Sequence, residues 1–294
     1  MRVPCSTSNL GAGFDCLGLA FERYLDAEYL PGPDPLRVER TGTLAGLDCP
    51  DDEDRLVRAL RTGLDAQPAT GVLRAHSEIP IARGLGASAA ATVAGLSLAR
   101  LALGEALDRT ALLERASELE GHPDNAAPAL FGGLTAVACD EQRRPHAFLL
   151  PLAQEIGFVY AAPDVGIATA AARAALPANV PHDAAARMLG RIAALVRGLQ
   201  TRDVELIRLG MIDELHVPHR LPLIPGAERA LDAAHAAGAW GATVSGAGSG
   251  LVAACEHGSE ETVLAALMGA LGERAIGFVA TPDLYGVREH SVAS

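Results

Sequence analysis

The stretch Pro80-Ile-Ala-Arg-Gly-Leu-Gly-Ala-Ser-Ala-Ala-Ala91 places two glycines between an apolar segment and a long alanine-rich run. Alanine has the highest intrinsic helix propensity, so the run after Gly86 predicts a helix. Glycine lets a backbone approach a ligand closely, and the first turn of a helix offers unpaired N–H groups and a positive dipole end to an anion. The stretch therefore predicts a phosphate-binding loop, with the Ser88 hydroxyl facing a phosphate or a metal ion.

The same glycines admit two other interpretations. Gly84-x-Gly86-x-x-Ala89 satisfies a loose dinucleotide-binding pattern, with Glu105 at a tolerable distance for a ribose contact. This interpretation would put Pro80 and Arg83 in a buried central strand, where a proline removes a ladder hydrogen bond, so we discount it. A plain helix-start turn without a ligand stays open for this segment taken alone.

Outside this loop, helices and strands alternate irregularly. We expect strands within residues 3–30 around a tight loop, over 71–82, over about 131–162, on both sides of a loop in 241–256, and over 275–287. We expect helices over 51–64, 109–120 (with Asp108 as N-cap), 183–209, 226–238 and 259–272. This order predicts an α+β fold instead of a doubly wound sheet. A boundary near 155–165 would give two domains of ordinary size, 1–158 and 159–294.

The composition excludes several classes of protein. The chain has 294 residues with a formal net charge of -12, which opposes a nucleic-acid-binding surface. It contains no lysine, so all 24 basic residues are arginines, which excludes a Walker-A loop and a Schiff-base lysine. Five scattered cysteines indicate reduced thiols. No apolar run has the pattern of a signal peptide or the length of a membrane span, so we expect a cytoplasmic protein.

Several polar clusters could carry chemistry. Asn9 and Asp15 lie in a glycine-rich loop, where they could orient a polar substrate or simply form turns. The segment from Glu118 to Asn125 crowds carboxylates and His122 at a helix end, which suits a magnesium site or a solvated helix terminus.

Three further patterns could indicate a site. His216 and His219 have a zinc-like spacing, but Pro218 disrupts the helix between them and no third ligand is apparent, so we reject zinc. Arg173 and Arg220 could be surface charges, or each could clamp a carboxylate through two parallel hydrogen bonds. A Ser-His-Asp hydrolase would need a GxSxG elbow, and none is present.

Taken together, these motifs resemble the GHMP small-molecule kinases over nearly the whole chain. VPCSTSNLGAGFDCLGLA, from Val3, is similar to the N-terminal signature of that family, IPIARGLGASAAA to its phosphate loop, and VSGAGSGLV, from Val244, to its C-terminal glycine loop. EGHPDNAAPALFGG, from Glu120, resembles the homoserine kinase branch in particular, as do the stretches around Arg173 and Arg220.

The resemblance implies a fold, two substrates and a cofactor. The fold would be an N-terminal domain like ribosomal protein S5 domain 2, with a left-handed βαβ unit, followed by a ferredoxin-like C-terminal domain. The ligands would be ATP, Mg²⁺ and L-homoserine, in a step of threonine biosynthesis. The partners would be these small molecules, without nucleic acid or membrane, and a homodimer is an expectation of the resemblance alone.

The resemblance also implies roles for individual residues. The nucleotide would lie along Pro80, Ile81, Ala82, Arg83, Gly84, Leu85, Gly86, Ala87, Ser88, Ala89 and Ala90. The metal ligands would be Ser88 and Glu120, with Glu118 as the competing assignment. The substrate pocket would contain Asn9, Asp15, His122, Asp124, Asn125, Arg173 and Arg220. The two arginines would bind the substrate carboxylate and Asp15 its ammonium group, while Asn125 and Arg173 would act in catalysis, Asn125 by orienting the attacking hydroxyl.

The chain departs from the family pattern at three places. Ala87 stands where a second serine is common, Arg55 where an asparagine usually lies near the adenine, and Ser249-Gly250 where Pro-Thr or Pro-Ser is common. Two rival functions therefore stay open: a GHMP kinase for another small hydroxylated metabolite, and a catalytically silent member of the fold that senses a ligand.

Overall fold

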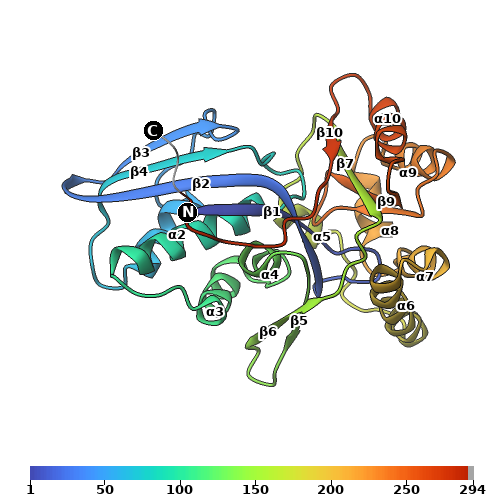
Figure 1. Ribbon diagram of the computed structural model, residues 1–294, viewed down its shortest axis with the longest axis horizontal. Helices are drawn as coiled ribbons and strands as arrows, with labels where there is room; N and C mark the ends of the chain where they lie inside the picture. The colour runs from blue at the N-terminus through green and yellow to red at the C-terminus, as the bar shows by residue number, and fades with distance from the viewer. Residues whose placement is uncertain (291–294) are drawn as a thin grey trace.

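The computed structural model describes residues 1–290, which form two β-sheets with helices packed against them (Figure 1). The first sheet has the strand order β3-β4-β2-β5-β6, with β1 paired to β2, and the second has the order β10-β7-β9-β8. The strands of the first sheet are β1 (Arg2–Ser8), β2 (Leu17–Pro35), β3 (Arg37–Gly42), β4 (Thr70–Ser77), β5 (Leu134–Cys139) and β6 (Pro145–Leu150). Those of the second are β7 (Ile156–Ala162), β8 (Gly241–Val244), β9 (Leu251–Glu256) and β10 (Ile276–Val279).

The helices follow the chain in two groups. The first group is α1 (Arg55–Gly63), α2 (Ala87–Ala102), α3 (Arg109–Glu120) and α4 (Ala126–Phe131). The second is α5 (Thr169–Ala174), α6 (His182–Thr201), α7 (Val204–Gly210), α8 (Val217–Arg220), the short 3-10 helix η1 (Leu221–Leu223), α9 (Ala227–Ala236) and α10 (Glu260–Leu271). The mixture of sheets and helices confirms the predicted α+β class.

Helix α2 is the centre of the first half of the molecule. It packs against α1, α3 and the strands β1 and β2, and nearly all of its side chains from Ala89 to Ala99 are buried. Small side chains allow this contact, because a Cβ atom added at Gly95 would lie 2.5 Å from the carbonyl oxygen of Leu56 in α1. The alanine-rich sequence thus produces a helix that neighbours can approach on all sides, and this holds the start of α2 in place.

Local signals predicted some element boundaries well. Helix α3 begins where expected, and Asp108 Oδ1 accepts hydrogen bonds from the N–H groups of Thr110 at 2.9 Å and Ala111 at 3.2 Å. The strand expected over 71–82 ends earlier, at Ser77, because the Ser77 hydroxyl accepts the N–H of Ile79 in a local turn. Helices α4 and α5 were not predicted; Pro128 within α4 and the shortness of both hide the helical pattern.

The C-terminal segment corrects the strand expected over 275–287. Only Ile276–Val279 forms β10, and the chain then leaves the second sheet for the first. There, Glu22 donates its N–H to Thr281 at 2.8 Å, Asp283 donates to Ala20 at 3.0 Å, and Arg2 and Arg288 form an isolated antiparallel bridge. Figure 1 shows this segment as the dark red trace that runs back beside β1. The proposed division at 158/159 stays a prediction, and residues 281–288 lie on the first sheet.

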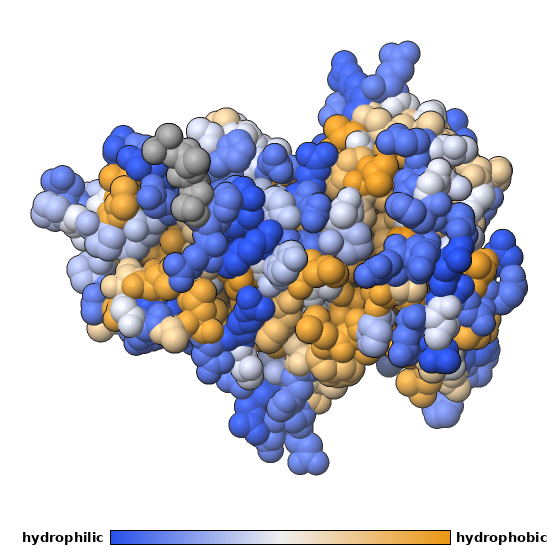
Figure 2. All heavy atoms as spheres, viewed as in Figure 1, coloured by the Kyte–Doolittle hydropathy of each residue, from blue (hydrophilic) through white to orange (hydrophobic). Residues whose placement is uncertain are grey.

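The surface of the molecule is uneven in polarity. Figure 2 shows hydrophilic residues over much of this face, with an apolar area at its lower centre. None of the helices in residues 1–290 combines the length and the apolar character that a membrane crossing requires.

The close packing of α1 on α2 can be tested with two glycines. Gly95→Ala should lower the free energy of unfolding by about 1–3 kcal/mol, since the new methyl group meets the Leu56 carbonyl and forces the helices apart. Gly190→Ala, in the exposed part of α6 with no atom within 4 Å of the added Cβ, is the matched control. It should be neutral or stabilise by up to about 1 kcal/mol through helix propensity. Urea unfolding of both variants measures the difference; equal midpoints would contradict the packing argument.

Candidate active site

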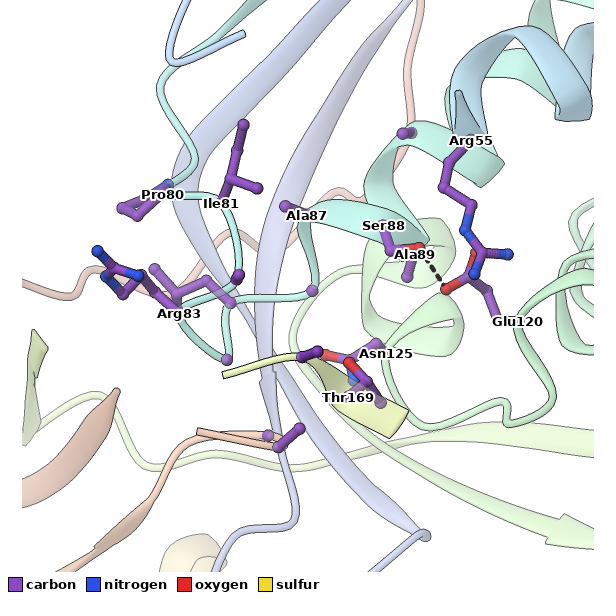
Figure 3. Close-up of a pocket in the computed structure, with 18 of the residues that line it drawn as sticks. Arg55, Pro80, Ile81, Arg83, Ala87, Ser88, Ala89, Glu120, Asn125 and Thr169 are labelled. Atoms are coloured by element: carbon purple, nitrogen blue, oxygen red, sulfur yellow. Dashed lines mark hydrogen bonds and ion pairs between the residues drawn. The ribbon is translucent and has the colours of Figure 1, made fainter. Parts of the chain in front are cut away.

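A cavity of about 620 Å³ opens where the start of α2 faces the loops of the second half of the molecule. One end is mostly apolar and includes Leu44, Leu47, Leu56 and Ile81, and the other carries charged side chains from both halves. The size is typical of small-molecule sites. Figure 3 shows the side chains around the start of α2 that project toward this space.

Three glycine-containing loops form the wall between the two ends of the cavity. The N–H of Ser6 donates to Leu85 O at 3.1 Å, the N–H of Gly246 to Ser8 O at 2.9 Å, and the Ser245 hydroxyl to Gly84 O at 2.7 Å. Gly84 has a φ of +72°, and a Cβ there would lie 2.0 Å from the Ser245 carbonyl oxygen. The glycine is therefore required both by backbone conformation and by space.

The first turn of α2 has the features of an anion site. Gly86 occupies the N-cap position in a left-handed conformation and supplies no capping side chain. The N–H groups of Ala87, Ser88 and Ala89 have no hydrogen-bond acceptor in the described part of the chain, and all three residues line the cavity. Of the predicted nucleotide residues, Pro80 through Ala89 line the cavity, while Ala90 is fully buried in the core.

Glu120 lies beside the start of α2. Its Oε2 accepts the Ser88 hydroxyl at 2.7 Å, and its Oε1 accepts the Thr92 hydroxyl at 2.6 Å (Figure 3). Its side chain is 5% exposed, so these bonds are shielded from solvent. The competing residue, Glu118, points to the surface and pairs with Arg115 at 2.8 Å. Thr92 was missed in the sequence, although its position one helical turn after Ser88 puts both hydroxyls on one face.

Arg55, one of the departures from the family pattern, lies over the same carboxylate. Its Nη1 donates to the Leu119 carbonyl at 3.2 Å and lies 3.9 Å from Glu120 Oε1. Figure 3 shows the guanidinium beside Glu120, at the edge of the cavity away from the phosphate loop. The positive charge partly offsets that of the carboxylate when the cavity holds no cation.

The predicted substrate residues come together at the other end of the cavity. Arg173 donates two parallel hydrogen bonds to the Asp15 carboxylate, at 2.8 and 3.1 Å. Arg220 is 1% exposed, and its Nη1 donates to Gly246 O at 2.8 Å. Asn9, His122, Asp124, Asn125, Arg173 and Arg220 all line the cavity, whereas Asp15 reaches it through Arg173.

Hydrogen bonds to neighbouring side chains fix Asn125 and Asp124. Asn125 Oδ1 accepts the Ser6 hydroxyl at 3.0 Å, and its Nδ2 donates to the Ser8 hydroxyl at 2.8 Å. Asp124 is buried, and its Oδ1 lies 2.6 Å from His122 Nδ1. Asp124 Oδ2 has no hydrogen-bond partner within residues 1–290. A buried carboxylate oxygen without a partner is costly, so it is suited to a donor group of a ligand.

The pKa values of His122 and Asp124 depend on their burial and on their contact with each other. Burial opposes the charge of both groups, but the short hydrogen bond and the mutual attraction outweigh it. As a result, the pKa of His122 lies above its ordinary value and that of Asp124 below. The contact therefore favours the protonated imidazole beside the Asp124 carboxylate.

Comparison with known proteins agrees with this arrangement. Residues 54–133 match the model of the GHMP kinases N terminal domain, and residues 193–273 match the model of the GHMP kinases C terminal domain. The fold and the site therefore define a kinase of the GHMP class. A crystal structure of L. major mevalonate kinase has a TM-score of 0.73 over 96% of this chain and 95% of its own, and at 16% identity it shows the fold alone.

Relatives of higher sequence identity show which family of GHMP kinases the chain belongs to. A homoserine kinase of Thermus thermophilus is 41% identical over 91% of this chain and 90% of its own length, and one of Carboxydothermus hydrogenoformans is 36% identical over 89% and 88%. The crystal structure of homoserine kinase from Cytophaga hutchinsonii has a TM-score of 0.82 at 26% identity, covering 97% of this chain and 95% of that one. The chain belongs to the homoserine kinase family.

The ion pair of His122 with Asp124 can be tested by titration. We expect NMR signals of the His122 ring to report a pKa above the ordinary value of 6.5, and Asp124→Asn to lower that pKa, since the substitution removes the main interaction that opposes burial. The stability that the pair contributes is complete between pH 3.8 and 6.5, the ordinary pKa values of the two groups; it is lost as the pH rises through the raised pKa of His122 or falls through the lowered pKa of Asp124. The difference in Tm between wild type and Asp124→Asn should shrink outside that range. The same pKa in both proteins would contradict the pairing.

Proposed function

We propose that the protein is an ATP-dependent homoserine kinase, which transfers the γ-phosphoryl group of ATP to the side-chain hydroxyl of L-homoserine. The observation that carries the proposal is that the unpaired amides at the start of α2 share one cavity with the charged groups Asp124, Arg173 and Arg220, and that Asp15 is paired with Arg173 beside it. The first set suits a polyphosphate and the second suits an amino acid.

The nucleotide would extend along the phosphate loop. Its phosphates would accept hydrogen bonds from the amides of Ala87, Ser88 and Ala89, which also present the positive end of the α2 dipole. Its base would occupy the apolar end of the cavity, between Leu44, Leu47 and Ile81. No lysine is needed, because backbone N–H groups supply the cradle.

The residues around Glu120 fit a magnesium ion. Mg²⁺ prefers one or two carboxylates together with phosphate oxygens and water. Within residues 1–290, no group of three or more His, Cys, Asp or Glu side chains could hold a metal alone, which agrees with a site completed by ATP. Glu120 would bind the ion with the Ser88 hydroxyl nearby, and the bound ion would neutralise charge on the transferred phosphoryl group.

The acceptor would bind by its two charged groups. Arg173 and Arg220 would hold the carboxylate of homoserine and Asp15 its ammonium group, with Asp124 Oδ2 as a further acceptor for a substrate donor. Asn125, fixed between Ser6 and Ser8, would orient the hydroxyl toward the phosphate loop. Phosphoryl transfer has a loose transition state, so positioning and charge neutralisation supply most of the catalysis, and we assign no general base.

Three broader features accompany this function as proposals. They are a cytoplasmic location, a place in threonine biosynthesis and a homodimer. Large apolar side chains at the surface support a dimer, among them Phe148, Leu149, Leu284 and Tyr285, which are 51–67% exposed. The formal charge of -12 gives no reason to expect a nucleic-acid partner.

Acceptor specificity tests the proposal directly. With purified protein, ATP and Mg²⁺, L-homoserine should be consumed well ahead of mevalonate, galactose or shikimate, because only homoserine carries both charges that the arginines and Asp15 can pair. Coupled detection of ADP gives the rates. Preference for another acceptor would favour the rival GHMP kinase, and nucleotide binding without turnover of any acceptor would favour the ligand sensor.

The metal site can be tested with three variants. Ser88→Ala and Glu120→Gln should each lower kcat by about 10- to 100-fold and weaken Mg²⁺ binding, since each removes an oxygen that fixes the ion. Titration of ATP binding at several Mg²⁺ concentrations provides a readout that does not depend on turnover. Glu118→Gln is the matched control, because its carboxylate lies at the surface. Normal rates in both site variants would refute this site.

A further inference from the structure

His216 lies at the contact between the two halves of the molecule and takes no part in the proposed binding of ATP, magnesium or homoserine. Its side chain is completely buried. The Nε2 atom lies 3.2 Å from the carbonyl oxygen of Asn9, and the Nδ1 atom lies 3.4 Å from Nη1 of Arg220. The ring stacks on Phe14, with 5.2 Å between ring centroids. One imidazole therefore contacts both the N-terminal glycine loop and an arginine of the substrate pocket.

The two neighbours determine which ring nitrogen carries the proton. A carbonyl oxygen can only accept a hydrogen bond and a guanidinium can only donate one. Nε2 must therefore carry hydrogen and Nδ1 must be bare. Burial, with a smaller contribution from the charge of Arg220, outweighs the attraction of Asp213 and lowers the pKa of His216 to about 4. The imidazole is neutral at physiological pH, as this arrangement requires.

The guanidinium of Arg220 has more contacts that fix its orientation than the guanidinium of Arg173 has. Its guanidinium donates to Gly246 O at 2.8 Å, contacts His216 and lies 5.3 Å from the centre of the Phe14 ring. Its Nε has no partner in the described residues. The Arg173 side chain is 35% exposed, and among residues 1–290 it is fixed only by Asp15, which a substrate ammonium would contact. Arg220 is thus oriented before the substrate arrives.

We propose that His216 is a positioning residue for the acceptor: its Nε2–H tautomer anchors the ring to the Asn9 loop, and its bare Nδ1 orients Arg220 toward the carboxylate of the substrate. The inference rests on the proposed function, in which Arg220 binds that carboxylate. It also distinguishes the two members of the zinc-like pair, because His216 is buried against Arg220 whereas His219 is half-buried, and neither lines the cavity.

Two amide substitutions separate the two contacts. In His216→Asn the side-chain oxygen can take the place of Nδ1 and still accept from Arg220, whereas in His216→Gln the amide can take the place of Nε2 and still donate to Asn9 O. We expect His216→Gln to raise KM for L-homoserine by at least about tenfold, the effect of a lost hydrogen bond to a charged group, with kcat and KM for ATP nearly unchanged. His216→Asn should retain most of the affinity for homoserine. His219→Asn, on the same helix, is the control and should match the wild type.

The outcomes distinguish this inference from a purely structural role and from failure of the proposed function. A structural role predicts that both His216 variants lose Tm and that KM changes for ATP and homoserine together, which would overturn the inference. Absence of homoserine turnover in the wild type would refute the function instead. Long-range ¹H–¹⁵N NMR of the imidazole tests the proposal without catalysis and without any variant. A hydrogen on Nδ1 would overturn it, since that atom could not then accept from Arg220.

Discussion

The first turn of α2 must leave its amides unpaired while everything around it is packed. A buried helix start usually acquires a capping side chain, because each orphan N–H costs free energy away from water. Here Gly86 fills the cap position without a side chain, and hydrogen bonds from Ser6 of β1 and from the loop residue Ser245 hold the backbone of the phosphate loop in place. The unmet hydrogen-bonding capacity is directed into the cavity. The neighbouring loops, the small side chains of α2 and the placement of Glu120 all serve to keep that surface open.

The charged part of the site draws on both halves of the molecule. Asp15 belongs to the N-terminal loop and Arg173 to α5, yet they form a two-bond ion pair that joins the two halves. Arg220 comes from α8 and reaches the backbone of Gly246. A phosphoryl acceptor that binds among these groups contacts both halves at once. Its binding affinity therefore depends on the relative position of the two halves.

Much of this was predictable from the sequence, and the exceptions have physical causes. The alanine-rich run after Gly86 and the N-cap Asp108 act locally, so propensity and capping rules located α2 and α3. The choice of Glu120 over Glu118 needed the direction of each side chain at the end of α3, which sequence spacing left open. Ser6, Ser8 and Thr92 were missed because they are common hydroxyls without a distinctive pattern. His216 was considered only as a zinc ligand, because its contact with Asn9 joins residues 207 positions apart in the sequence.

The return of residues 281–288 to the first sheet gives the chain two crossings between its halves, one between β6 and β7 and the other after β10. A single tether would let one half swivel and twist freely relative to the other. Here the second crossing restricts such movement, and the two halves also share one buried apolar cluster, in which Phe21 of β2 lies against Phe158 of β7. The backbone after Val279 is therefore a structural part of the connection between the halves and not a dispensable tail.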